Sequence, residues 1–250
     1  MPPADSSEGK EGNSMKVFAL TDKGMYRETN EDAYYINQEE LAFAVADGMG
    51  GHNAGDVASR IVTDRLADID FISTESLKEA FISINSDIYV ESASNKDYQG
   101  MGTTLTLLRI RDRVAQICHI GDSRAYLIRG GTIKQLTTDH TIVNELLKIE
   151  EITAEQAHEH PYQNVLSRAL GVEKQIHPED IKLELEAGDS LLLSTDGLHG
   201  FVPAESIQDV FLSKQGHAEA IAKELIRLAF EQGGKDNVTV VVITDLFNRE

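Results

Sequence analysis

The feature that most restricts the fold is a strand-rich block of four stretches separated by very short connections. Thr103–Ile110 is followed closely by Val114–Ile120, and Ala125–Arg129 is followed closely by Thr132–Gln135. Stretches of this length and composition are typical of β-strands. Short connections favour antiparallel hairpins, because a parallel connection needs a longer crossover. The block therefore predicts antiparallel sheet structure.

The other predicted elements are grouped along the chain rather than alternating. Helical spacing of apolar residues predicts helices at Ala54–Asp68, Ser76–Ser92, Ala204–Ser213 and His217–Gln232. Further strands are predicted at Val17–Thr21, Leu41–Ala46, Ile181–Leu185, Ser190–Ser194 and Val238–Thr244. Grouped strands and helices indicate an α+β fold in which helices cover antiparallel sheets.

Two segments do not fit this pattern. Residues 138–171 are polar and helix-prone, and Thr153 with Gln156 forms a capping box that predicts a short helix. Residues 1–14 are small, polar and aperiodic, so we expect a disordered leader or a non-native remnant. Residues 15–250 contain no internal boundary and are expected to form a single domain.

Charge and cysteine content exclude several classes of protein. The 23 Lys and Arg residues against 42 Asp and Glu residues give a net charge of −19, which disfavours nucleic acid and anionic membrane surfaces as partners. No apolar stretch is long enough to span a bilayer, and no secretory signal is visible at the start. A single cysteine, Cys118, fits a reducing compartment, so a cytoplasmic location is expected.

Four aspartates share a pattern in which Asp borders an apolar strand and a small or polar residue follows it. The pattern occurs in AVADG, HIGDS, LLSTDG and KDN, and the residues are Asp47, Asp122, Asp196 and Asp236. Carboxylates that converge at one edge of a sheet sandwich raise each other's pKa unless a cation lies among them. Oxygen ligands without cysteine favour Mg²⁺ or Mn²⁺. One such Asp is commonly a turn residue, but four together predict a metal site.

The segment AVADGMGGHNAG has three glycines close to Met49. Glycine permits close backbone approach, so the carbonyl of Gly48 is a candidate cation ligand. The alternative is a flexible turn between a strand and a helix. Dinucleotide binding is excluded, because the glycine spacing does not match and Asp47 stands where a pyrophosphate needs positive potential.

Eight motifs in order resemble the PPM/PP2C family of metal-dependent protein phosphatases, in its bacterial single-domain form, over most of residues 16–245. They are TDKGMYRETNEDA at 21–33, VADGMGGHNAGDVAS at 45–59, GMGTTL at 100–105, HIGDSRAYLIR at 119–129, LTTDHT at 136–141, LSRALG at 166–171, GDSLLLSTDGL at 188–198 and GGKDNVTVVV at 233–242. The resemblance implies a central sandwich of two antiparallel β-sheets flanked by pairs of helices. It also implies a flap over the active site at residues 141–165, in which Glu150 stands where many members have glycine.

The resemblance assigns metal-binding roles to the matched residues. Asp47 would bridge two catalytic metals, and Asp196 and Asp236 would complete the ligands of the first. The Gly48 carbonyl would bind the second metal. Glu31 and Asp32 would bind the second metal or one of its waters. Asp122, together with Asp196, would hold a third, weaker ion; its alternative role is that of a turn residue at a strand end.

Other matched residues would act on the substrate. The guanidinium of Arg27 would hold the phosphate, whose oxygens its planar fork matches. His52 would either protonate the leaving alkoxide or hydrogen-bond to metal-bound water. Asn237 would orient Asp236. We assign Cys118, His119 and His140 to structure rather than chemistry. Cys118 and His119 lie on a core-like strand, where neutral packed residues are commoner than ligands.

The implied activity is hydrolysis of phosphoserine and phosphothreonine by water or hydroxide bridging two Mn²⁺ or Mg²⁺ ions, without a phosphoenzyme. Substrates would be phosphoproteins, with a Ser/Thr kinase and its targets as expected partners of a monomeric enzyme. Three alternatives stay open. These are a pseudophosphatase that binds phosphoproteins without turnover, a phosphoesterase for small molecules, and an acidic interaction domain.

Overall fold

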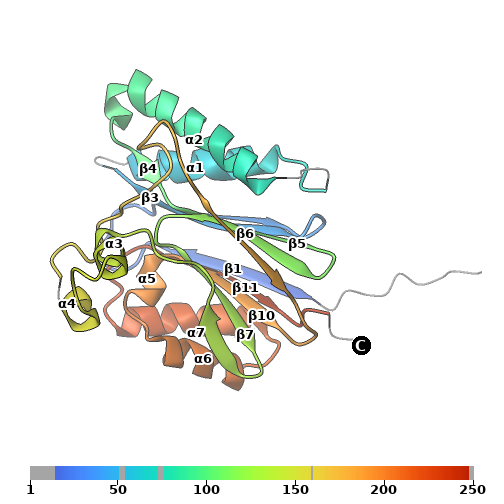
Figure 1. Ribbon diagram of the computed structural model, residues 1–250. Coiled ribbons are helices and arrows are strands. Elements are labelled where there is room, and N and C mark those ends of the chain that lie inside the picture. The colour runs from blue at the N-terminus through green and yellow to red at the C-terminus, as the bar shows by residue number, and fades with distance from the viewer. Residues whose placement is uncertain (1–14, 51–53, 73–75, 159, 248–250) are drawn as a thin grey trace, which may run out of the picture.

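The computed structural model describes residues 15–50, 54–72, 76–158 and 160–247. Two antiparallel sheets lie face to face, with helices on both outer faces, and this arrangement confirms the predicted fold class (Figure 1). The first sheet has the order β1-β11-β10-β7-β8. Its strands are β1 Lys16–Asp22, β7 Arg124–Arg129, β8 Thr132–Gln135, β10 Ser190–Ser194 and β11 Val238–Thr244.

The second sheet has the order β2-β3-β5-β6-β9, and the short strand β4 pairs with β3. Its strands are β2 Asp32–Asn37, β3 Ala42–Met49, β4 Gly102–Thr103, β5 Leu105–Arg111, β6 Val114–Ile120 and β9 Glu179–Glu184. The two predicted hairpins are confirmed, as β5 pairs with β6 and β7 with β8. The turn at residues 188–189 joins strands of different sheets, because β9 pairs with β6 whereas β10 pairs with β7 and β11.

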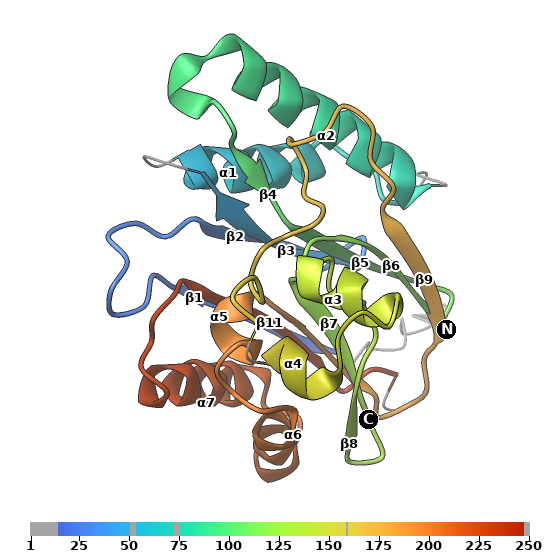
Figure 2. The same ribbon diagram turned by 60° about the vertical axis from the view of Figure 1, so that its left-hand side comes forward.

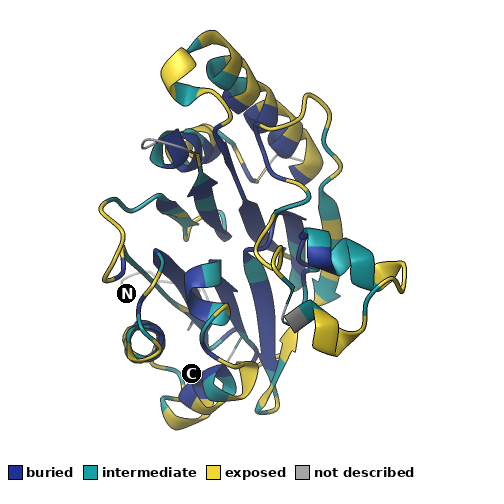
Figure 3. Ribbon diagram, turned by 90° about the vertical axis from the view of Figure 1, so that its left-hand side faces the viewer, coloured by how far each residue is buried: buried dark blue, intermediate teal, exposed yellow. Residues whose placement is uncertain are grey.

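Apolar residues on both faces of each sheet hold the layers together. Between the sheets, Phe43 and Leu108 pack in one cluster with Leu193 and Val241. The helices α1 Ala54–Ala67 and α2 Leu77–Ser94 cover the second sheet, where Val62 and Phe81 share a cluster with its strands. The helices α6 Ala204–Ser213 and α7 Ala218–Glu231 cover the first sheet. Figure 3 shows both sheets largely buried and the outer faces of these helices exposed.

The central strands are buried because their sequences are apolar on both faces. All seven residues of β11, a run rich in β-branched side chains, are buried between β1 and β10. Sheets enclosed on both faces require such continuous apolar strands rather than alternating ones. None of the helices in the described ranges is long and apolar enough to cross a membrane.

The flap, residues 141–165, leaves and re-enters the fold at neighbouring points. Thr141 and Leu166 form an isolated β-bridge, and the Ser167 N–H donates to the His140 carbonyl at 2.9 Å. The flap contains α3 Ile142–Lys148 and α4 Ala154–His158, which lie beside the short helix α5 Asp196–His199 (Figures 1 and 2). A 3-10 turn, η1 Lys96–Tyr98, lies elsewhere, after α2.

Local sequence bears on the start of α4 and on the turn that follows α3. The Thr153 N–H donates to Gln156 Oε1 at 2.8 Å and the Gln156 N–H to Thr153 Oγ1 at 3.3 Å, so the predicted capping box is present. Glu150 follows α3 with φ of 58°, a left-handed conformation that favours glycine. The position at which this chain has Glu150 and many family members have glycine is therefore a turn whose backbone conformation is unfavourable for residues with a side chain.

Candidate active site

The predicted site residues converge on a cavity of about 540 Å³ at one end of the sandwich. Arg27 lies in the loop between β1 and β2, and the others stand at or beside the end of a strand or the start of a helix, so segments from both sheets supply the walls. Residues from the predicted set that line the cavity are Arg27, Glu31, Asp47, Gly48, Asp122, Asp196, Asp236 and Asn237. Of the other predicted site residues, Asp32 pairs with Asp47 in the sheet register, whereas His52 lies outside the described residues.

Asp47 is fixed through its backbone by two buried threonines. Its N–H donates to Thr104 Oγ1 at 2.9 Å, and its carbonyl accepts from the Thr104 N–H and the Thr103 hydroxyl, both at 2.9 Å. These contacts place the half-buried carboxylate at the cavity wall without using its own oxygens. Sequence reasoning did not assign Thr103 or Thr104 to the site.

Close packing explains the glycine that follows Asp47. A Cβ atom at Gly48 would lie 2.1 Å from the Gly55 carbonyl oxygen and 2.6 Å from that of Glu31. Only glycine allows the end of β3 to approach the start of α1 and the loop before β2 this closely. The Gly48 N–H also donates to the Glu31 carbonyl at 3.1 Å, so Gly48 and Glu31 are held together.

Asn237 organises the loop that carries Arg27 and Glu31. Its side-chain amide donates to the carbonyls of Lys23 and Thr29, at 3.0 and 2.9 Å, and its Oδ1 accepts from the Glu31 N–H at 2.8 Å. Only its backbone N–H reaches Asp236, donating to Oδ1 at 2.8 Å. The Asn237 side chain therefore positions the loop at residues 23–31, and Asp236 is oriented by the backbone.

Asp32 is buried and bonded on one side only. Its Oδ2 accepts from the hydroxyls of Thr195 and Thr239, at 2.8 and 2.7 Å, whereas its Oδ1 is buried without a hydrogen-bond partner. Thr195 follows β10 and Thr239 lies in β11 of the first sheet, whereas Asp32 begins β2 of the second sheet. These hydrogen bonds therefore tie the two layers together beneath the cavity. The free Oδ1 is an acceptor that a cation or its water would satisfy.

Asp196, at the start of α5, and Asp236, in the loop before β11, lie on neighbouring segments that approach very closely. A Cβ at Gly197 would be 1.8 Å from the Asn237 carbonyl oxygen, so glycine is required beside Asp196. Arg27 donates through Nη2 to Asp236 Oδ2 at 2.7 Å, although its side chain is 54% exposed. The guanidinium is thus held at the cavity mouth and remains open to solvent.

Two histidines hold the turn that carries Asp122. His140 Nδ1 accepts from the Gly121 N–H at 3.1 Å, and the His140 N–H donates to the Gly121 carbonyl at 2.7 Å. His199 Nε2 donates to the Asp122 carbonyl at 3.1 Å, which requires its Nδ1 to accept from the Ser194 hydroxyl. Burial lowers the pKa of His140 to about 4 and that of His199 well below its ordinary value, so both rings are neutral. His199 was not recognised in the sequence.

The pKa values of the aspartates in and beside the cavity are raised, because these groups lose hydration and repel one another. Loss of hydration, followed by repulsion from neighbouring aspartates, raises the pKa of Asp122 to about 8 and that of Asp196 to about 6. The same causes raise the pKa of Asp47 well above its usual range. Loss of hydration also raises the pKa of Asp32 to about 7, against the two threonine hydrogen bonds.

This donor set fits divalent cations. Several carboxylates with mutual repulsion, one unpaired buried oxygen at Asp32 and a backbone carbonyl at Gly48 form an oxygen-rich site whose excess negative charge a hard cation would neutralise. A second close group, His119, His140 and Glu179, fits a metal less well. The two ring nitrogens of His119 contact Thr106 and Thr138, and both Glu179 oxygens accept from Thr138.

Comparison with known proteins agrees with this geometry. A model of the protein phosphatase 2C family matches residues 27–236. The chain is 38% identical to protein phosphatase PhpP of Streptococcus pneumoniae over 240 residues, covering 92% of this chain and 97% of that protein. The crystal structure of the Mycobacterium tuberculosis phosphatase PstP/Ppp superposes with a TM-score of 0.85 at 39% identity, covering 92% and 98% of the two chains. The PstP catalytic domain in complex with two manganese ions gives a TM-score of 0.82 at 38% identity, covering 92% and 97%.

Proposed function

Because the chain belongs to the protein phosphatase 2C family of metal-dependent protein serine/threonine phosphatases, we propose that its acidic cavity hydrolyses phosphoserine and phosphothreonine by direct attack of water. The observation that carries this proposal is the convergence of Asp47, Asp122 and Asp196 on one cavity, with Arg27 at its mouth. A carboxylate cluster alone repels a phosphate, so the site needs bound cations to accept one.

Asp47, the Gly48 carbonyl, Asp196 and Asp236 would hold two divalent ions. Glu31 and Asp32 would bind the second ion or its water, and Asp122 with Asp196 would hold a third, weaker one. When bound, such ions lower the pKa of water and neutralise charge on phosphate oxygens. The two manganese ions in the PstP catalytic domain support this assignment, and Mn²⁺ or Mg²⁺ suits a site made only of oxygens.

The remaining residues would orient the substrate and manage its protons. The guanidinium of Arg27 presents a planar fork to two phosphate oxygens and stabilises the charge that grows on them during in-line attack. His52 would donate a proton to the leaving serine or threonine oxygen, or order the water around it. Asn237 keeps the loop at residues 23–31 in place, so it would position Arg27 and Glu31 rather than contact substrate.

A covalent cysteine mechanism does not suit this chain. Cys118 lies within β6, and its side chain is fully buried. Burial, followed by repulsion from Asp180, raises the pKa of its thiol to about 12, so the reactive thiolate is scarce near neutral pH. Hydrolysis without a phosphoenzyme is the mechanism that the acidic cavity supports.

Phosphoproteins are the substrates of such an enzyme, and we propose a Ser/Thr kinase and its targets among them. We further propose that residues 15–250 act as one monomeric catalytic domain in the cytoplasm. The single buried thiol, which needs no oxidising compartment, supports the location. The strongly negative net charge supports protein rather than nucleic-acid partners.

The test is phosphate release from a phosphothreonine peptide with added Mn²⁺ or Mg²⁺ and with EDTA. We expect metal-dependent turnover of the peptide that EDTA abolishes and that exceeds turnover of a small sugar phosphate. A preference for the sugar phosphate would instead identify a small-molecule phosphoesterase. Tight peptide binding without any release of phosphate would identify a pseudophosphatase.

A further inference from the structure

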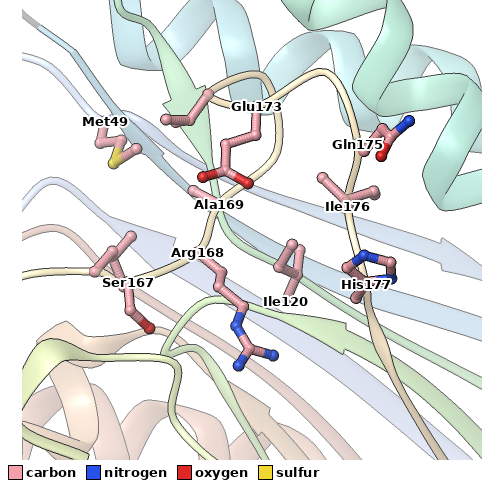
Figure 4. A pocket seen from close by; sticks show the side chains of 11 residues that line it. Met49, Ile120, Ser167, Arg168, Ala169, Glu173, Gln175, Ile176 and His177 are labelled. Atoms are coloured by element: carbon pink, nitrogen blue, oxygen red, sulfur yellow. The ribbon is translucent and has the colours of Figure 1, made fainter. Parts of the chain in front are cut away.

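A second cavity, of about 400 Å³, adjoins the catalytic one. Met49 lines both cavities, and so does Leu166, directly after the flap, so the two spaces adjoin at the same residues. Figure 4 shows the second cavity from close by. A peptide whose phosphorylated residue occupies the catalytic cavity therefore has this second cavity within reach of a neighbouring side chain.

The outer wall of this cavity is rigidly attached to the fold. Asn85, a buried residue of α2, donates from Nδ2 to the Glu173 carbonyl at 2.9 Å and accepts the Gly171 N–H on Oδ1 at 2.8 Å. Gly171, with φ of 85°, packs against Ile88 of the same helix. The segment from Gly171 to Glu173 is thus anchored at both ends before any ligand arrives, which reduces the entropic cost of binding.

The cavity combines apolar walls with one uncompensated charge. Met49, Ile120 and Ile176 contribute apolar surface, and Ile120 is fully buried. In Figure 4 the Glu173 side chain extends toward Ala169, among the lining residues. Across residues 15–50, 54–72, 76–158 and 160–247, no ion pair or side-chain hydrogen bond reaches the Glu173 carboxylate.

The positive charge in the wall, on Arg168, already has an ion-pair partner. Arg168 donates from Nη2 to Glu145 Oε1 on α3 at 3.2 Å, and Figure 4 shows its side chain directed away from Glu173. The exposed His177 completes this part of the wall. The free charge that faces the cavity is therefore negative, and it lies beside apolar surface.

We propose that this cavity is a substrate subsite that takes a lysine or arginine side chain close to the phosphorylated residue of the protein substrate. The aliphatic stem would pack against Met49, Val172 and Ile176, and the cationic end would pair with the Glu173 carboxylate, as long basic side chains do on mixed surfaces. An acidic side chain would instead meet the unpaired Glu173. This inference rests on the proposed phosphatase function and names a preference among its substrates.

The experiment compares kcat/KM for phosphothreonine peptides that carry one lysine at each position within about four residues of the phosphothreonine, against an all-glutamine background, since each extended residue advances about 3.3 Å. Wild type should prefer lysine at one position by about threefold, the size expected for a partly exposed ion pair. Glu173→Gln should lose the preference, and Glu173→Lys should prefer glutamate at that position. Glu205→Gln, which removes the same charge from the exposed surface of α6, should keep the lysine preference.

Turnover of an aryl phosphate and of the all-glutamine peptide should be unchanged in all three variants, because Glu173 does not contact the reacting phosphate. The proposal is overturned if Glu173→Gln keeps the wild-type preference, or if wild type shows no preference for lysine at any position. Failure of every protein to hydrolyse the all-glutamine peptide would refute the phosphatase function itself, so the two failures are distinguishable.

Discussion

Replacing Asp122 by asparagine should stabilise the protein without metal and weaken its stabilisation by metal. The change keeps the size of the side chain and removes the carboxyl group of a residue that is only 8% exposed. Loss of hydration, followed by repulsion from Asp196 and Asp139, raises the pKa of Asp122 to about 8. The folded state therefore binds this proton up to about pH 8, whereas the unfolded chain releases it near pH 4.

The sign and size of the effect follow from this difference. Between about pH 4 and pH 8 the folded state binds more protons than the unfolded state, so stability falls as the pH rises, by at most about 1.4 kcal/mol per pH unit. At pH 7.5 the total cost of the carboxyl group is at most about 5 kcal/mol. Neighbouring carboxylates take up part of it, so we expect Asp122→Asn to gain about 2 kcal/mol, or roughly 4–8 °C in Tm.

Thermal unfolding in EDTA and in Mn²⁺ measures both expected effects, the gain in stability without metal and the weaker stabilisation by metal. Asp209→Asn, an exposed change on α6, is the control and should alter neither value. In Mn²⁺ the gain in stability of Asp122→Asn should shrink or reverse. Ions that bind only the folded state stabilise it, and the variant lacks one of the carboxylates proposed to bind them. Calorimetry should still find two tightly bound ions, and phosphopeptide turnover should fall on the order of 10²-fold, with a smaller loss for an aryl phosphate. Equal destabilisation in EDTA and in Mn²⁺ would refute the reasoning and reduce Asp122 to a turn residue.

Two further changes test other parts of the account. Arg27→Ala should lower kcat/KM for a phosphopeptide by a factor that corresponds to about 1.5–3 kcal/mol, while calorimetric metal affinity stays nearly the same, and the opposite pattern would mean that Arg27 serves the metals. His140→Asn, which retains a hydrogen-bond acceptor for Gly121, should reduce acid sensitivity. The folded pKa of His140 is lowered to about 4, so its neutral form contributes fully above about pH 6.5 and its contribution is lost towards pH 4. Denaturant unfolding of wild type and His140→Asn at several pH values in EDTA should differ in slope by up to about 1.4 kcal/mol per pH unit over that range, and equal slopes would contradict a neutral His140.

Much of the secondary structure could be predicted because its signals are local. The bounds of β6, β8, β10, β11 and α6 match the predicted ranges. All but β8 are apolar runs or stripes closed by turn residues, whereas β8, TIKQ, is mostly polar and is marked by the glycine turn before it. The strand β2 was missed because its sequence, DAYYIN, mixes polar and aromatic residues and follows a polar turn. The helix α5 has four residues, too few for a helical period to be visible.

The division of strands between the two sheets could not be read from local sequence. The strands β9 and β10 are separated by a short connection but pair with different partners, because pairing depends on contacts distant in the chain. Family resemblance supplied the two-sheet sandwich where periodicity alone gave only antiparallel sheets covered by helices. The bounds of the flap followed from the same source.

The candidate site was predictable where its residues stand at strand ends and not where they support others. Asp47, Asp122, Asp196 and Asp236 share a visible sequence pattern, and the structure brings all four to connected cavity walls. The buried hydroxyls of Thr103, Thr104, Thr195 and Thr239, and the ring of His199, carry no such pattern, because their importance comes from single hydrogen bonds across the fold. The catalytic and metal-binding roles of the predicted residues, including that of His52, stay predictions.

The most direct test of the account is the Asp47→Asn variant, assayed on a phosphothreonine peptide with Mn²⁺ and titrated with Mn²⁺ by calorimetry. The substitution keeps the backbone contacts to Thr103 and Thr104 and removes only the carboxylate charge proposed to be shared between two ions. We predict turnover near background and fewer bound ions, with a circular dichroism spectrum like that of wild type. Near-normal turnover with two ions still bound would contradict the proposal that Asp47 bridges the catalytic metals.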